Sequence, residues 1–136
     1  MEDINIQGKK GEYLIPVVHF SVEKGVCEMG GESYHENTFE FYHPLITWLE
    51  EYTATVKKPL TFNFRLSYFN TAASRGITDM LHVLKQYQEN GGEVSINWYY
   101  LDWDVDILEE IEDFAGDIGI DINTIPIPED EDQETL

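Results

Sequence analysis

The stretch Leu60-Thr-Phe-Asn-Phe-Arg-Leu-Ser-Tyr-Phe-Asn-Thr-Ala-Ala-Ser-Arg75 decides the fold of this chain. In its first half every second residue is large and apolar, namely Leu60, Phe62, Phe64, Leu66 and Tyr68. This alternation is the period of a half-buried strand. Beyond Asn70-Thr71 the apolar residues follow helical spacing, at Ile77, Met80, Leu81 and Leu84. The stretch therefore predicts a central strand that runs through a tight turn into a helix.

Before this stretch, the sequence predicts a flexible lead-in, a hairpin and a helix. The lead-in covers residues 1–12, which are polar and contain Gly. Residues 16–22 and 26–29 are expected to pair as a hairpin, with Gly30-Gly31 ending the second strand. Asn37 is expected to cap a helix that runs to about Thr55, and Glu40 to complete a capping box. Pro44 should kink this helix or mark the start of its regular part.

After this stretch, the sequence predicts two more helices, two more strands and a tail. The second helix should run from about Ala72 to Gln88, and residues 94–100 alternate as a strand. Residues 102–106 should open an acidic third helix, and residues 122–127 should form a short last strand. Residues 128–136 are expected to be an acidic disordered tail. The buried face of the third helix is predicted to hold Val105, Leu108, Ile111 and Phe114.

Strands that alternate with helices predict parallel strands joined by helical crossovers. The expected fold class is therefore α/β, with a single mixed β-sheet, an N-terminal hairpin and βαβ crossovers. The length of 136 residues suits one domain, which we place at residues 13–127.

The chain is strongly acidic, with a formal net charge of −19. Lys85 is the last basic residue, so everything after it carries only negative charge. This balance argues against nucleic acid or an anionic membrane as partner and favours a positively charged protein surface. An alternative is that the acidity simply aids solubility. No apolar run approaches the length of a membrane span, no signal peptide is visible, and Cys27 has no second cysteine to pair with. These features predict a cytoplasmic protein.

The sequence contains no convincing motif for catalysis, a metal or a cofactor, and we expect none of the three. Asp102-x-Asp104-x-Asp106 resembles the start of a calcium loop, but Ile107 and Asp113 stand where that loop needs Gly and Glu. The four histidines lie on separate predicted elements, and no phosphate-binding glycine loop follows a strand.

Two features are candidates for a functional surface. The hydroxyl of Thr71 falls at the start of a helix, where unpaired N–H groups and the helix dipole would stabilise a phosphate. The alternative is that Asn70 and Thr71 are ordinary N-cap residues. The aromatic run from Trp98 to Trp103 could supply an anchor in a protein interface, or only core and rim packing.

Four stretches together resemble the SiaC-type regulatory phosphoproteins, a bacterial partner-switching family with a fold related to STAS domains. They are Gly31-Glu-Ser-Tyr-His-Glu-Asn37 with Phe39-Glu40-Phe41, then Ser67-Tyr-Phe-Asn-Thr71 with Ser74, then Val94-Ser-Ile-Asn-Trp-Tyr-Tyr100, and the acidic helix after it. The similarity covers roughly residues 13–127 and implies a STAS-like domain without enzymatic activity.

The resemblance implies a function and a site. It implies that a partner kinase phosphorylates Thr71, that a phosphatase reverses this, and that the unphosphorylated form activates an effector such as a diguanylate cyclase, controlling biofilm formation. Ser74 is a secondary candidate for the modification. Asn70 and Arg75 are expected to surround the phosphate, because Arg75 lies on the same helix face four residues after Thr71. Candidate partner-interface residues are Tyr34, Asn37, Tyr68, Tyr99 and Trp103.

The chain departs from the family pattern at two places. Ala72-Ala73 stand where the family has serines, which leaves Thr71 and Ser74 as the possible acceptors, and His35 replaces a proline. Two other functions stay open at this point: a small enzyme that uses carboxylates in an acidic cleft, and a plain protein-interaction scaffold. A carboxylate with a raised pKa in a pocket would favour the enzyme. An exposed turn at Thr71 would favour the regulator.

Overall fold

The computed structural model describes residues 1–128, so the tail predicted at residues 128–136 lies almost wholly outside the described part. Residues 1–128 form six strands and three α-helices, with one π-helical turn, η1, after the first helix. Their bounds are β1 Ile4–Ile6, β2 Val17–Ser21, β3 Val26–Ser33, α1 Thr38–Glu51, η1 Tyr52–Val56, β4 Leu60–Phe69, α2 Thr71–Glu89, β5 Val94–Leu101, α3 Val105–Ile118 and β6 Asn123–Ile127.

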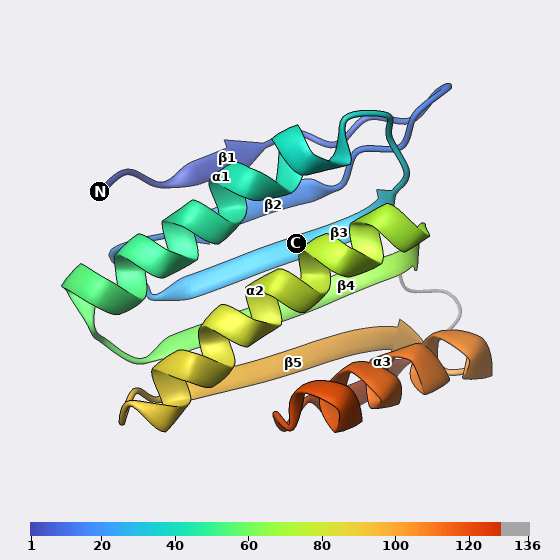
Figure 1. Ribbon diagram of the computed structural model, residues 1–136. Helices are drawn as coiled ribbons and strands as arrows, with labels where there is room; N and C mark the ends of the chain where they lie inside the picture. The colour runs from blue at the N-terminus through green and yellow to red at the C-terminus, as the bar shows by residue number, and fades with distance from the viewer. Residues whose placement is uncertain (129–136) are drawn as a thin grey trace.

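The strands form a single mixed sheet in the order β1-β2-β3-β4-β5-β6. The pairs β1–β2 and β2–β3 are antiparallel, whereas β3 to β6 are all parallel. Each parallel pair is joined by a helix, and the crossovers all advance in the same direction across the sheet. Because such crossovers are right-handed, α1, α2 and α3 pack on the same side of the sheet, as Figure 1 shows. This confirms the predicted fold class.

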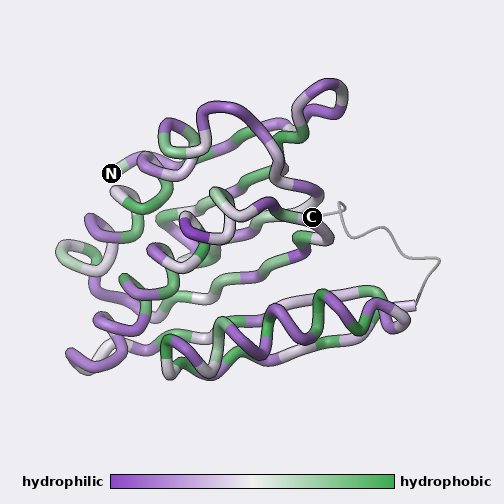
Figure 2. Tube along the Cα trace, turned by 45° about the vertical axis from the view of Figure 1, so that its right-hand side comes forward, coloured by the Kyte–Doolittle hydropathy of each residue, from purple (hydrophilic) through white to green (hydrophobic). Residues whose placement is uncertain are grey.

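The core lies between the sheet and this helix layer, and β4 runs through its centre. Phe62, Phe64 and Trp98 stack one on the next, with centroids 4.2 and 4.5 Å apart. Phe114 of α3 adds a ring 6.0 Å from Trp98, which fixes α3 over β5. Figure 2 shows hydrophobic and hydrophilic residues alternating along each helix, as expected for helices with one face on the sheet.

The central alternation holds as far as Leu66 and then fails, because the pairing of β3 with β4 shifts register. Gly31 lies opposite Leu66, but Glu32 lies opposite Tyr68, so Ser67 is an extra residue on β4. The irregularity turns Tyr68 outward and Phe69 into the core. The prediction that Tyr68 shares the buried side was therefore wrong. Gly30-Gly31 also does not end β3, which continues to Ser33.

The first residues contain a strand that the sequence did not predict. Ile4–Ile6 pairs with β2, and the side chain of Asp3 accepts a hydrogen bond from the backbone N–H of Val22 at 2.9 Å. The indole N–H of Trp48 donates to the Glu2 carbonyl at 2.8 Å. A three-residue strand is too short for its alternation to be recognised in the sequence.

Helix α1 begins where predicted but is capped differently. The side chain of Asn37 makes no capping hydrogen bond, so the capping box with Glu40 was wrong. Instead, the Thr38 hydroxyl donates to the carbonyl of His35 at 2.9 Å. The helix passes through Pro44, which does not mark its start, and Lys57 in left-handed conformation ends the π-helical turn that follows.

Helix α3 differs from its prediction at one buried position. Val105 is exposed, and Ile107 is buried in its place. The reason is the cap: Asp104 accepts a hydrogen bond from the N–H of Ile107 at 3.2 Å, so Val105 is the first helical residue and faces solvent. The rest of the apolar face, with Ile111 and Phe114, lies against the core as expected.

Candidate functional site

The carboxyl ends of the parallel strands meet at one side of the sheet, which we call the carboxyl edge. Strands β3, β4 and β5 end there at Ser33, Phe69 and Leu101, and α1, α2 and α3 begin there (Figure 1). In open α/β sheets this edge is the usual place for binding, because the loops and the helix N-termini converge on it.

Thr71 is the first residue of α2 and is exposed at the carboxyl edge. Asn70 is the N-cap, and its side-chain Oδ1 accepts a hydrogen bond from the N–H of Ala73 at 2.9 Å. No side chain within residues 1–128 hydrogen-bonds to the Thr71 hydroxyl. The cap is thus complete without Thr71, and its hydroxyl is accessible.

Two further residues of the predicted phosphosite lie on the same helix. Arg75 is exposed, one turn after Thr71, where its side chain can reach an anion at the helix start. Ser74 is half-buried, and its backbone N–H donates to the Asn70 carbonyl at 2.9 Å. It faces a cavity lined by Glu110, Asp113 and Asp117. A phosphate on Ser74 would therefore face carboxylates, so the geometry favours Thr71.

Several large apolar side chains are exposed at the carboxyl edge. The most exposed are Phe39 at 76%, Val105 at 66%, Trp103 at 58% and Tyr68 at 48%. Each lies directly after β3, β4 or β5, or near the start of the next helix. Exposed apolar groups gathered at one edge indicate a protein-binding surface. We call this group the edge aromatics: Tyr13, Tyr34, Phe39, Tyr68, Trp103 and the neighbouring Val105.

The predicted interface residues fall in two places. Tyr34 and Tyr68 lie together, with ring centroids 6.5 Å apart, and Trp103 and the exposed Asn37 share their edge. Tyr99 instead points to the side of the sheet away from the helices, where the guanidinium of Arg65 lies 4.2 Å from its ring centroid. The structure therefore separates Tyr99 from the other four.

Sequence reasoning missed Phe39, Val105 and Tyr13 as surface residues. Phe39 is the most exposed of all and stacks on His43, one turn later, at 5.1 Å. The signal was present in the spacing, because Tyr42, Leu45 and Leu49 define the buried stripe of α1 and Phe39 lies off it. Tyr13 was missed because its position depends on the bridge between Leu14 and Tyr34.

An acidic groove with an apolar floor runs between α2 and α3, with Ser74 in its wall. Two adjoining cavities, of about 460 and about 320 Å³, share Phe69, Glu110 and Asp113 in their walls. The pKa of Glu110 is raised by partial burial and by the negative charges of its neighbours Asp104, Asp106 and Asp113. A cationic partner group would relieve this repulsion. The carboxylates that line the groove are Asp104, Asp106, Glu109, Glu110, Asp113 and Asp117.

His35 packs beside α1. Its ring lies 4.8 Å from that of Phe41, and burial lowers its pKa. Neither ring nitrogen has a hydrogen-bond partner in the described part of the chain. Its role here is packing, together with the carbonyl that receives the Thr38 hydroxyl.

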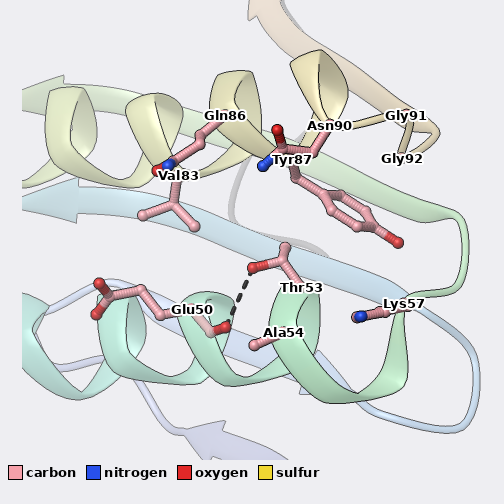
Figure 3. A pocket seen from close by; sticks show the side chains of 10 residues that line it. All are labelled: Glu50, Thr53, Ala54, Lys57, Val83, Gln86, Tyr87, Asn90, Gly91 and Gly92. Carbon is pink, nitrogen blue, oxygen red and sulfur yellow. Dashed lines mark hydrogen bonds between the residues drawn. The ribbon is translucent and has the colours of Figure 1, made fainter.

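A cavity of about 620 Å³, larger than the two that form the acidic groove, lies at the other end of α2. Figure 3 shows Thr53 and Lys57 on one wall and Tyr87 on the other. The Thr53 hydroxyl donates to the Glu50 carbonyl at 3.1 Å, and the Tyr87 hydroxyl to the Lys58 carbonyl at 2.8 Å. These polar groups serve the local backbone and do not converge on a ligand.

Residues 1–128 contain neither a candidate membrane span nor a candidate metal site. No helix there is long and apolar enough to span a bilayer. No three side chains among the His, Cys, Asp and Glu of that range are grouped so that they could hold a metal ion.

Comparison with known proteins gives consistent matches. The family model described as SiaC family regulatory phosphoprotein matches residues 7–127. An uncharacterised protein of Pseudomonas aeruginosa, strain UCBPP-PA14, is 31% identical over 117 residues, covering 86% of this chain and 90% of that protein. The crystal structure of apo-SiaC from Pseudomonas aeruginosa superposes with a TM-score of 0.83 at 29% identity, covering 92% of this chain and 99% of that chain.

A third match is a crystal structure of the diguanylate cyclase SiaD in complex with its activator SiaC, also from Pseudomonas aeruginosa. It superposes with a TM-score of 0.81 at 27% identity, covering 90% of this chain and 100% of that chain.

Proposed function

This chain belongs to the SiaC family of regulatory phosphoproteins, and we propose that it is a partner-switching regulator controlled at Thr71. It is a regulator and not an enzyme. In the proposal, a partner kinase phosphorylates Thr71 and a partner phosphatase removes the phosphate. The unphosphorylated form binds and activates an effector in the bacterial cytoplasm. The proposed effector is a diguanylate cyclase, because SiaC of Pseudomonas aeruginosa is the activator of such an enzyme, and the outcome is control of biofilm formation.

The observation that carries this proposal is the position of the Thr71 hydroxyl. It is exposed, the cap of α2 does not use it, and it lies at the same edge of the sheet as the edge aromatics. A kinase can therefore reach the hydroxyl without unfolding the chain. The first turn of α2 and the neighbouring Arg75 can then hold the added phosphate.

A phosphate at Thr71 would change the partner surface by its charge. It adds about −1.5 to −2 charges to an apolar edge that otherwise fits an apolar partner surface. Desolvating such a dianion against an apolar surface is costly, so effector binding would be lost without a large change of fold. The acidic groove favours an effector whose docking segment carries Lys or Arg, because complementary charges steer association.

The modification itself is tested by mass spectrometry of the protein isolated from its own cells. We expect phosphate on Thr71, none on Ser74, and none in a strain that carries Thr71→Ala. A phosphate found only on Ser74, or on neither residue under conditions in which the cognate kinase is expressed, would refute the proposed site.

The switch is tested by measuring affinity for the purified diguanylate cyclase of the same organism at one salt concentration. We expect wild type and Thr71→Ala to bind alike, and Thr71→Glu to bind more weakly. Thr47→Glu is the matched control, because it adds the same charge to an exposed position of α1. Equal affinities for all four proteins would leave Thr71 as an ordinary first residue of a helix.

A further inference from the structure

The side of the sheet away from the helices, which we call the outer face, is not covered by any helix of residues 1–128 (Figure 1). Strands β3 to β6 are parallel, and parallel sheets are almost always covered on both faces. An open face on four parallel strands therefore suggests that something outside the described fold covers it.

The outer face is defined by the residues that alternate with the core positions along the strands. These are Asn5, Val17, His19, Ser21, Val26, Glu28, Gly30, Glu32, Thr61, Asn63, Arg65, Tyr68, Ser95, Asn97, Tyr99, Leu101, Asn123, Ile125 and Ile127. Glu28 and Glu32 are the carboxylates among them and Arg65 is the guanidinium. This near-neutral face belongs to a chain with a net charge of −19. Depletion of charge in the buried centre is typical of protein interfaces.

The polar groups at the centre of the outer face already satisfy one another. Asn63, Asn97 and Asn123 are direct neighbours across β4, β5 and β6. The amide of Asn97 donates to Asn63 at 2.9 Å, and that of Asn123 donates to Asn97 at 3.0 Å. Polar groups that are hydrogen-bonded to each other lose less on leaving water than unpaired ones do. The row can therefore be covered at a modest desolvation cost.

Two of the charged residues of the outer face, Glu28 and Arg65, are arranged so that the face can complement itself. Glu28 on β3 lies opposite Asn63 on β4, and Arg65 is the next outward residue of β4. No ion pair joins Glu28 to Arg65 in the part of the chain that the structure describes. In a two-fold dimer whose axis passes between them, Glu28 of each copy meets Arg65 of the other. Arg65 is held in place for this by its contact with the ring of Tyr99.

We propose that the outer face is the interface between two copies of this chain, related by a two-fold axis. A second copy fits better than a cationic partner, because the outer face is nearly neutral whereas the acidic groove lies on the helix side. With six strands about 4.8 Å apart, each several residues long, the flat area of the outer face is about 500 Å². Side chains that project from it add to this area. This approaches the roughly 800 Å² per partner of a standard interface. Thr71 begins α2, on the helix side of the sheet, so the dimer does not depend on the proposed function.

The proposal is tested by sedimentation velocity over a range of protein concentrations, at one salt concentration. We expect wild type to dimerise, and both Glu28→Arg and Arg65→Glu to raise the dimer dissociation constant at least about tenfold, the scale of a close interfacial charge pair. The double variant, Glu28→Arg with Arg65→Glu, should restore the dimer because the charges then pair in the opposite sense. Glu23→Arg is the matched control, since it makes the same charge change in an exposed turn outside the face. Circular dichroism checks the fold of each variant.

A second measurement does not depend on the folding of the Arg65 variants. A spin label at Ser95→Cys, an exposed position of the outer face, should show dipolar coupling between two copies, whereas a label at His82→Cys on α2 should show less. The native Cys27 is buried and should not be labelled. A wild-type protein that stays monomeric at every concentration would overturn the proposal. So would a dimer that keeps its affinity in both single charge reversals, or one whose coupling appears only at position 82.

Discussion

The side-chain Oδ1 of Asn70 accepts a hydrogen bond from the backbone N–H of Ala73 at 2.9 Å. This bond makes Asn70 the cap of α2 and leaves the next residue, Thr71, without a structural hydrogen bond from its hydroxyl in the described chain. The helix cap and the proposed phosphorylation site are thus different residues. A phosphate on Thr71 would change the charge at the start of α2 without removing the cap.

The division between the two residues predicts different losses of stability. Asn70→Ala should lower the free energy of unfolding by about 0.5–2 kcal/mol, because it removes the cap. Thr71→Ala should change it by less than about 0.5 kcal/mol, as for other exposed positions. Urea denaturation of the two variants and wild type checks this. An equal or larger loss in Thr71→Ala would show that its hydroxyl supports the helix after all.

Two helical glycines predict opposite effects of the same substitution. A Cβ at Gly76 would lie 2.4 Å from Cγ of Tyr42, whereas one at Gly116 would meet nothing within 4 Å. Tyr42 cannot move aside easily, because it is buried and its hydroxyl is 2.9 Å from that of Ser33. Gly116→Ala should therefore raise the free energy of unfolding by up to about 1 kcal/mol through helix propensity. Gly76→Ala should lower it by about 1–3 kcal/mol through overpacking.

Thermal and urea unfolding of the two glycine variants decide between propensity and packing. Each variant serves as the control for the other, since both add one methyl group inside a helix. A stabilised Gly76→Ala would mean that α2 can move away from Tyr42 of α1. The two helices would then be less tightly fixed than the close contact indicates.

The sequence was sufficient for the architecture because the strongest periodicities coincide with the core. The alternation from Leu60 to Leu66 gave the central strand, and the change of period at Asn70 placed Thr71 at a helix start. Burial confirmed both of these points. The exposure of Thr71 followed from its place in the first turn.

The details that the sequence did not predict depend on contacts between distant residues. Tyr68 continues the apolar alternation in sequence, and only its pairing with β3 turns it outward. Gly30-Gly31 reads as a turn, yet both glycines lie inside a paired strand. The edge aromatics and the acidic groove come together only when the carboxyl ends of three strands meet, so single stretches could not reveal them.

The raised pKa of Glu110 predicts how stability depends on pH. Its causes are partial burial first, then the charges of Asp104, Asp106 and Asp113. A carboxyl whose folded pKa exceeds its unfolded pKa binds more protons in the folded state between the two values, so stability falls as pH rises through that window. Glu110→Gln should therefore raise the free energy of unfolding at neutral pH and flatten its decline just above the ordinary pKa of Glu.

Urea unfolding on both sides of this window measures the effect of Glu110→Gln. Glu112→Gln is the control, because it removes the same charge from an exposed position of α3 that does not line the groove. A larger gain from Glu112→Gln would mean that net charge alone, and not the setting of Glu110, limits stability.

The edge aromatics predict a separation between stability and binding. Phe39 and Trp103 are 76% and 58% exposed, so replacing either by Ala should change the free energy of unfolding by less than about 0.5 kcal/mol. If they anchor the effector, each replacement should weaken binding by at least about 1 kcal/mol, because aromatic side chains supply much of the energy of interfaces. The measurement is titration of each variant with the purified diguanylate cyclase of the same organism. Gln86→Ala, at an exposed position near the other end of α2, is the control and should bind as wild type does. Unchanged affinity in both aromatic variants would move the docking surface away from the carboxyl edge, and Thr71 would then have to act on partners from a distance.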